Sequence, residues 1–333
     1  MKYFLGLFLH LLMCGGSVSA QENAKWNSRA TLLEARQEIY AGVANGKIYV
    51  AGGIGADGAP LASFERYHPK ANKWEGLPPL PQPRHHVAVV GVTNKVFAIG
   101  GFTGSWPNWQ AQSKVNVFDS ENMTWSTGPS LPQPRGEQVA VVVGQNIFVI
   151  GGRVKKTPNS GTFFEHIDTN LNTCFLATAK KWMPCAPMPT ARNSHAAAVI
   201  DGKIYVVGGR RNVFDAGGRV TIDNLAILEV YNPEANSWTT RAPMPIAQGG
   251  LAAAAHSGRL YVFGGEQFTP HQKVFANVWV YDPGLDHWSA LPPLPTPRHG
   301  LAAAAIGQEI YAIGGASRVG FGAVLTNEAL MLK

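Results

Sequence analysis

Residues 80–101 read Leu80-Pro-Gln-Pro-Arg84-His-His-Val-Ala-Val-Val-Gly-Val-Thr-Asn-Lys-Val-Phe-Ala-Ile-Gly100-Gly101, and the pattern returns at Leu131-Pro-Gln-Pro-Arg135. Six stretches of this kind occur, each with an aromatic residue three positions before a glycine doublet. The doublets are Gly52-Gly53, Gly100-Gly101, Gly151-Gly152, Gly208-Gly209, Gly264-Gly265 and Gly314-Gly315. Self-similarity at a fixed period near 50 residues predicts a repeat architecture for the whole chain.

Each repeat begins at a fixed position, sixteen residues before the first glycine of its doublet. Arginine holds that position five times and glutamine once, at Arg36, Arg84, Arg135, Arg192, Gln248 and Arg298. Within each repeat the pattern predicts four short strands: an apolar one rich in small residues, one ending at the doublet, one ending in an aromatic residue, and one carrying a tryptophan. These tryptophans are Trp74, Trp125, Trp182, Trp238 and Trp288, and packing between sheets is their expected role.

The last repeat lacks its fourth strand. Only 36 residues run from Arg298 to the end, whereas the earlier repeats span 48 to 57 residues. A tryptophan in the required context, Trp26, lies in residues 21–35. We therefore expect the N-terminal strand to complete the last sheet and close the repeats into a ring, which removes exposed strand edges.

Composition supports one all-β domain at 21–333. The 333 residues include 37 Gly and 23 Pro, and 15% are charged. The net charge of +7 is spread along the chain, so no nucleic-acid partner is expected. Residues 1–20 have the features of a signal peptide: Lys2, an apolar run, and small residues at Val18 and Ala20. We expect a periplasmic or secreted protein, with no membrane association after cleavage, and a disulfide between Cys174 and Cys185.

The doublets, the aromatic residues before them, the later tryptophans and the Pro-x-Pro-Arg links resemble the Kelch repeat. The resemblance covers the whole predicted mature chain and implies a six-bladed β-propeller. It leaves function open, because Kelch propellers include cytoskeletal and substrate-adaptor modules, sugar epimerases and copper oxidases.

The repeat register brings the loops that carry chemistry to one face of such a propeller. The expected ligand-binding residues there are Arg36, Arg84, Arg135, Arg192, Arg298, Gln248, His85, His86, His299, Trp106 and Trp109. Five cations around one opening favour an anionic ligand, since few carboxylates lie nearby. In the alternative interpretation these arginines belong to the repeat and bind backbone carbonyls between blades. The sequence does not separate the two.

A metal centre is a further alternative because of His85, His86, His195 and His299, but their spacing matches no tight ligand motif. Kelch-like copper oxidases have Tyr-His after the arginine and a tyrosine crosslinked to cysteine. Here Arg192 is followed by Asn-Ser-His195, without the tyrosine. We expect neither a metal nor another cofactor.

Two functions therefore remain. The first is an exported recognition module, monomeric or weakly oligomeric, that binds an anionic carbohydrate or a protein. The second, implied by resemblance to bacterial N-acetylneuraminate epimerase, is a mutarotase for a carboxylated sugar. An enzyme of that type needs proton-exchanging groups, and the candidates are Glu38, Glu137 and His195.

Overall fold

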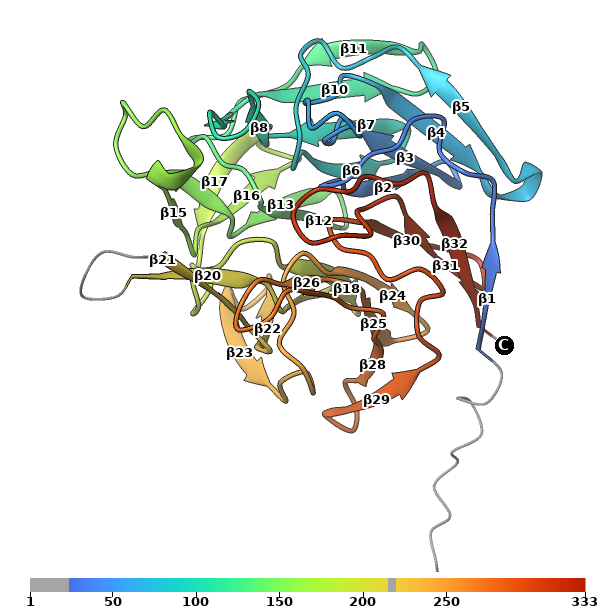
Figure 1. Cartoon of the computed structure of the whole chain (residues 1–333). Coiled ribbons are helices and arrows are strands. Elements are labelled where there is room, and N and C mark those ends of the chain that lie inside the picture. The colour runs from blue at the N-terminus through green and yellow to red at the C-terminus, as the bar shows by residue number, and fades with distance from the viewer. Residues whose placement is uncertain (1–23, 215–219, 333) are drawn as a thin grey trace, which may run out of the picture.

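The computed structural model describes residues 24–214 and 220–332, which form six four-stranded antiparallel sheets arranged around a central axis (Figure 1). The predicted signal peptide at 1–20 lies outside the described residues. The all-β, six-bladed propeller predicted from the repeats is confirmed.

The strands of each blade follow one another outward from the axis. Blades one to three contain β2 (Ala41–Ala44), β3 (Lys47–Ala51), β4 (Phe64–His68) and β5 (Lys73–Leu77); β6 (Ala88–Val92), β7 (Lys95–Ile99), β10 (Val115–Asp119) and β11 (Thr124–Thr127); and β12 (Val139–Val143), β13 (Asn146–Ile150), β16 (Asn172–Leu176) and β17 (Lys181–Cys185). Blades four to six contain β18 (Ala196–Ile200), β19 (Lys203–Val207), β22 (Leu228–Asn232) and β23 (Ser237–Arg241); β24 (Ala252–His256), β25 (Arg259–Phe263), β28 (Val278–Asp282) and β29 (His287–Leu291); and β30 (Ala302–Ile306), β31 (Glu309–Ile313), β32 (Asn327–Met331) and β1 (Lys25–Ser28). The innermost strands of neighbouring blades contact one another, which explains their small alanine and valine side chains.

The N-terminal strand closes the ring, as the sequence predicts. Strand β1 pairs with β32, so that Trp26 lies opposite Leu330. The Trp26 indole donates a hydrogen bond of 3.0 Å to the carbonyl of Pro292 in the preceding blade. The five other fourth-strand tryptophans make the same kind of bond, for example Trp74 to Ala30 and Trp288 to Ala242. Each tryptophan therefore fastens its blade to the one before it.

The glycine doublets fasten each blade to the one after it. The second glycine donates its N–H to the carbonyl of the next repeat's first residue, as in Gly53 to Arg84 at 2.9 Å and Gly315 to Arg36 at 2.9 Å. A Cβ on Gly52 would lie 2.2 Å from the Arg84 carbonyl oxygen. Glycine is required there because the backbones of two blades approach so closely.

Small hairpins extend four blades on one face, between the second and third strands. They are β8 (Phe102–Thr103) with β9 (Gln110–Ala111), β14 (Arg153–Lys155) with β15 (His166–Asp168), β20 (Arg210–Phe214) with β21 (Val220–Asn224), and β26 (Glu266–Gln267) with β27 (Lys273–Val274). Single 3-10 turns cover Pro69–Ala71 and Phe163–Glu165. None of the helical segments among the described residues could span a membrane.

Cys174 and Cys185 form a disulfide with a Cα–Cα distance of 6.1 Å. The bond joins the adjacent strands β16 and β17. The sequence interpretation placed the extra residues of this longest repeat at 168–181. The structure instead places its long excursion earlier, in hairpin β14–β15, so the disulfide ties together two blade strands and does not pin an insertion.

Candidate ligand-binding pocket

The five repeat arginines are structural in this fold. Each is fully buried and donates to backbone carbonyls of its own blade. The Arg84 guanidinium, for example, bonds the carbonyls of Gly100 at 2.8 Å and Lys114 at 3.1 Å. This corrects the expected arginine-lined mouth, because Arg36, Arg84, Arg135, Arg192, Arg298 and the equally buried Gln248 do not line the pocket. Their carbonyl partners also lie within a blade and not between blades.

Each arginine has a side-chain partner at the second residue of the third strand. These partners are Glu65, Asn116, Thr173, Glu229 and Glu328. In blade five, where Gln248 replaces arginine, Trp279 holds the partner position and donates to the Gln248 side-chain oxygen at 3.0 Å. In the one repeat where glutamine replaces the arginine, the residue at the partner position therefore differs as well.

The residue two positions after each repeat start forms a ring around the axis. Its six members are Glu38, His86, Glu137, Ser194, Gly250 and Gly300, and all have positive φ between 47° and 66°. Backbone hydrogen bonds join several neighbours, including His86 N–H to the Glu38 carbonyl at 3.0 Å and Gly300 N–H to the Gly250 carbonyl at 2.8 Å. Non-glycine residues rarely adopt this conformation, so this ring is a candidate functional site.

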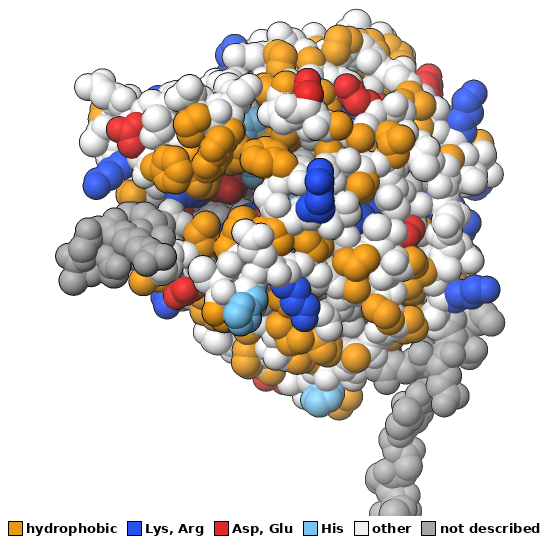
Figure 2. Space-filling view, in the orientation of Figure 1, with side chains coloured by type: hydrophobic (Ala, Val, Ile, Leu, Met, Phe, Trp, Pro, Cys, Tyr) orange, Lys and Arg blue, Asp and Glu red, His pale blue; other side chains and the backbone are white. Residues whose placement is uncertain are grey.

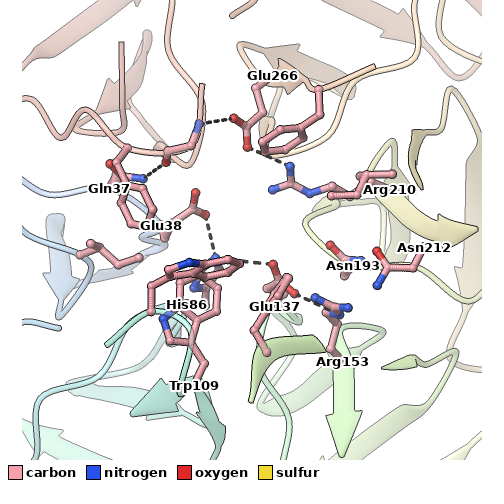
Figure 3. A pocket seen from close by; sticks show the side chains of 17 residues that line it. Gln37, Glu38, His86, Trp109, Glu137, Arg153, Asn193, Arg210, Asn212 and Glu266 are labelled. Atoms are coloured by element: carbon pink, nitrogen blue, oxygen red, sulfur yellow. Dashed lines mark hydrogen bonds and ion pairs between the residues drawn. The ribbon is translucent and has the colours of Figure 1, made fainter. Parts of the chain in front are cut away.

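A cavity of about 220 Å³ opens above this ring (Figure 3). Glu38, His86 and Glu137 belong to its lining. Other polar lining residues are Gln37, Arg153, Asn193, Arg210, Asn212 and Glu266, and the apolar ones are Ile54, Trp106, Trp109, Phe163, Ile222, Phe268 and Phe321. Figure 2 shows hydrophobic side chains gathered beside a hollow on this face.

Glu38 lies at the centre of a buried acid–imidazole network. Its carboxylate oxygens lie 2.9 Å from Nε2 of His86 and 3.4 Å from Nδ1 of His299. Burial acts to raise the pKa of Glu38, but the His86 charge and the bonds from His299 and His86 outweigh it and hold that pKa well below its usual range. For His299, burial acts to lower the pKa, but its bond to Glu38 and the Glu266 charge outweigh this effect. The pKa of His299 therefore lies above its usual value.

Glu266 links His299 to an arginine. One Glu266 oxygen lies 3.2 Å from His299 Nδ1 and accepts a hydrogen bond of 2.8 Å from Arg210. The other oxygen accepts the Gly320 N–H at 2.9 Å. Both carboxylate oxygens of this buried side chain are therefore occupied.

Glu137 has a carboxylate oxygen that accepts no hydrogen bond from the described residues. Its Oε1 accepts from the Ser194 hydroxyl at 3.3 Å, whereas its buried Oε2 has no hydrogen-bond partner among the described residues. The nearest cation, Arg153 Nε, is 3.7 Å away from that oxygen. A buried carboxylate oxygen with a free lone pair beside a cavity is suited to accept a hydrogen bond from a ligand hydroxyl or amine.

Of the other predicted site residues, Trp106 and Trp109 line the cavity. His85 and His299 do not line it but contact lining residues, Trp109 and Glu38 respectively. His85 Nδ1 lies 2.7 Å from His86 Nδ1, and His299 Nε2 donates to the Arg318 carbonyl at 2.9 Å. The structure corrects the prediction that His195 is a site residue. This residue does not line the cavity, and its Nε2 lies 3.1 Å from the Ile150 carbonyl. Burial and the Arg192 charge lower the pKa of His195 to about 3, so this imidazole is neutral and is not a candidate proton donor.

Sequence reasoning missed Arg153 and Glu266 as site residues. Both directly follow a glycine doublet, as does the lining residue Arg210, so the repeat register contained a second ring position that could have identified them. Arg153 and Arg210 both lie in ion pairs with buried carboxylates. The lining therefore holds three carboxylates, Glu38, Glu137 and Glu266, against two paired guanidinium groups.

Among the residues that the structure describes, one group of side chains has the ligand types for a metal ion. Ligand atoms of Glu38, Glu266 and His299 lie within 4.8 Å of one another, and all three residues are buried. Arg210, the Gly320 N–H and His86 already contact their carboxylate oxygens. These contacts explain the close approach of the two carboxylates as part of a network of ion pairs and hydrogen bonds.

The fold and pocket together define a six-bladed propeller with a pocket at one end of its axis. The family description "KLHDC2/KLHL20/DRC7 Kelch-repeats domain" matches residues 110–315, and "Kelch motif" matches residues 41–81 and 83–132. The chain belongs to the Kelch-repeat family.

Curated relatives and a solved structure agree with this assignment. The chain is 31% identical over 242 residues to Kelch-like protein terF of Aspergillus terreus, which covers 69% of this chain and 50% of that protein. It is 30% identical over 251 residues to alpha-scruin of Limulus polyphemus, covering 70% and 24%. The chain thus spans half or less of the curated relatives it matches. The structure of YjhT superposes with a TM-score of 0.75 at 15% identity, covering 92% of this chain and 97% of that one, which shows a shared fold.

Proposed function

We propose that this chain is a recognition propeller that binds one ring of a carbohydrate in the pocket. The free Oε2 of Glu137, buried beneath aromatic walls, carries this proposal. A sugar ring presents apolar C–H faces to aromatic side chains and hydroxyl donors to carboxylates. The cavity of about 220 Å³ is smaller than the 300–1,000 Å³ common for drug-sized ligands, so it suits a single ring.

The charge of the pocket favours a neutral or amine-bearing sugar over the carboxylated one predicted from the sequence. Three carboxylates line the pocket against two guanidinium groups, and Arg210 already donates to Glu266 at 2.8 Å. A ligand carboxylate would therefore add like charge to an acidic pocket, whereas a hydroxyl or ammonium group can donate to the free oxygen of Glu137.

Calorimetric titration with glucosamine, glucose and N-acetylneuraminate tests this. Glucosamine should bind best and N-acetylneuraminate worst. Glu137→Gln keeps the shape of the side chain but loses the charge, and we expect at least a tenfold loss of glucosamine affinity. Glu121→Gln, on an exposed outer turn of blade two, is the matched control and should bind normally. Preferred binding of N-acetylneuraminate would reject the charge argument.

A sugar mutarotase is the second candidate, favoured by the 2.9 Å contact of Glu38 and His86 at the cavity floor. Such a pair can exchange a proton with a ring oxygen or an anomeric hydroxyl. Anomer exchange followed by NMR separates the two functions: accelerated exchange that Glu38→Gln abolishes would indicate an enzyme. Binding without accelerated exchange would indicate a recognition module.

We also propose that the protein acts outside the cytoplasm. The Cys174–Cys185 disulfide supports this, because such bonds persist in oxidising compartments. Cell fractionation followed by N-terminal sequencing of the mature protein tests it; a cytoplasmic protein that retains residues 1–20 would overturn it. A protein partner that covers the pocket would appear as binding with which the sugar competes.

A further inference from the structure

Aromatic rings continue from the pocket onto the surface. Trp109 is buried, and its ring centroid lies 5.3 Å from that of Trp106, which is 46% exposed. Trp106 in turn lies 5.3 Å from Phe164, which is 63% exposed. We call the exposed pair Trp106 and Phe164 the aromatic shelf. Phe164 is not among the residues that line the pocket.

The aromatic shelf is held in place from two blades. Trp106 comes from the loop between β8 and β9, and Phe164 from the 3-10 turn between β14 and β15. The Phe163 N–H donates to the Pro107 carbonyl at 2.8 Å and joins these loops. Beneath the shelf, the Arg153 guanidinium stacks 4.0 Å from the Phe163 ring centroid.

The turn that carries Phe164 is itself braced. Glu165 accepts the backbone N–H groups of Gly161 at 2.8 Å and Thr162 at 3.0 Å. Rigid exposed rings lose little conformational entropy when a ligand binds, so they are efficient contact surfaces. An exposed tryptophan and phenylalanine in mutual contact at the rim of a pocket are therefore arranged for a ligand.

Resting on the proposed function, we propose that the aromatic shelf is a second subsite that takes the next rings of an oligosaccharide. The pocket holds one ring, and the shelf continues from it without a gap in the chain of aromatic contacts. The preferred ligand is thus a chain of neutral or amine-bearing sugars that is bound at its end.

Titration with glucosamine and its β-1,4-linked disaccharide and trisaccharide tests the subsite. We expect the trisaccharide to bind at least tenfold more tightly than glucosamine, because its additional rings bury apolar C–H surface against Trp106 and Phe164. Phe164→Ala should remove most of this gain and leave the affinity for glucosamine within twofold. Leu285→Ala removes another exposed apolar side chain, in the outer turn of blade five, and should change neither affinity.

The outcomes separate the two proposals. Equal affinity for glucosamine and the trisaccharide, with no effect of Phe164→Ala, would overturn the second subsite and leave the pocket proposal standing. Failure of every saccharide to bind the native protein would overturn both. Far-ultraviolet circular dichroism and the melting temperature of Phe164→Ala show whether the variant is folded; an affinity loss for glucosamine equal to that for the trisaccharide would also reject the subsite.

Discussion

The Glu38 carboxylate lies 2.9 Å from Nε2 of His86, although the two residues belong to different blades and both have left-handed backbone conformations. That conformation costs a non-glycine residue roughly 1–2 kcal/mol. Glu137 and Ser194 occupy the same ring position, whereas Gly250 and Gly300 meet it without strain. The chain thus places polar side chains around the axis at four ring positions at a cost in backbone energy, a pattern typical of functional sites.

The two ring glycines give a matched test of the pocket. Gly250→Ala should lower stability by about 1 kcal/mol because of its positive φ, and Gly300→Ala should lower it further because its Cβ would also lie 2.9 Å from the Glu38 backbone nitrogen. A Cβ at position 300 would lie 2.7 Å from Oε1 of Glu38, whereas one at 250 meets nothing closer than 3.5 Å. Only Gly300→Ala should therefore also weaken sugar binding. Denaturant unfolding and calorimetric titration check this, and equal binding by the two variants would contradict it.

Removal of a repeat arginine should reduce stability and leave ligand affinity unchanged. Arg192→Ala leaves the buried Glu229 carboxylate without its cation and should cost about 3–5 kcal/mol. Arg84→Ala leaves only the neutral Asn116 amide and should cost less, roughly 2–3 kcal/mol for the lost hydrogen bonds. Urea unfolding measures both. Arg192→Ala with Glu229→Ala should be more stable than Arg192→Ala alone. A loss of sugar affinity without a loss of stability would restore the ligand-binding interpretation.

The N-terminal strand should be necessary for a stable ring. Trp26→Ala removes a half-buried indole and its bond to Pro292, and we expect a loss of about 3 kcal/mol. Deletion of residues 21–35 should cost more, because it also exposes the edge of β32. Thermal unfolding measures the effect. An unchanged melting temperature after the deletion would contradict closure by β1.

Loss of the disulfide should destabilise blade three. Cys174 and Cys185 are 11 residues apart, and the chain-entropy estimate for so short a loop is roughly 2–3 kcal/mol. The double variant Cys174→Ala with Cys185→Ala should unfold at a correspondingly lower urea concentration, and dithiothreitol should lower the stability of the native protein but not of the variant. Labelling of both thiols in the native, non-reduced protein would contradict the bond.

The periodic residues allowed most of the fold to be predicted from the sequence. The doublets, the tryptophans and Trp26 predicted six sheets and their closure, because each repeat buries the same faces in the same way. The residues that line the pocket are also partly predictable: the loops that share one face indicate Glu38, Glu137, His86, Trp106 and Trp109.

The repeat register determined where along each blade a residue lies, but not the direction of its side chain. Arg84 and His86 are two positions apart, yet the arginine is buried within its blade while the left-handed turn directs His86 into the pocket. Arg153, Arg210 and Glu266 enter the site because each forms a β-bridge with the residue after its own repeat start, which brings the residues after the doublets to the same opening. The sequence by itself determined the ring and its closure. Only the tertiary structure decided which charges face the ligand, because that depends on backbone turns and contacts between blades that no single repeat contains.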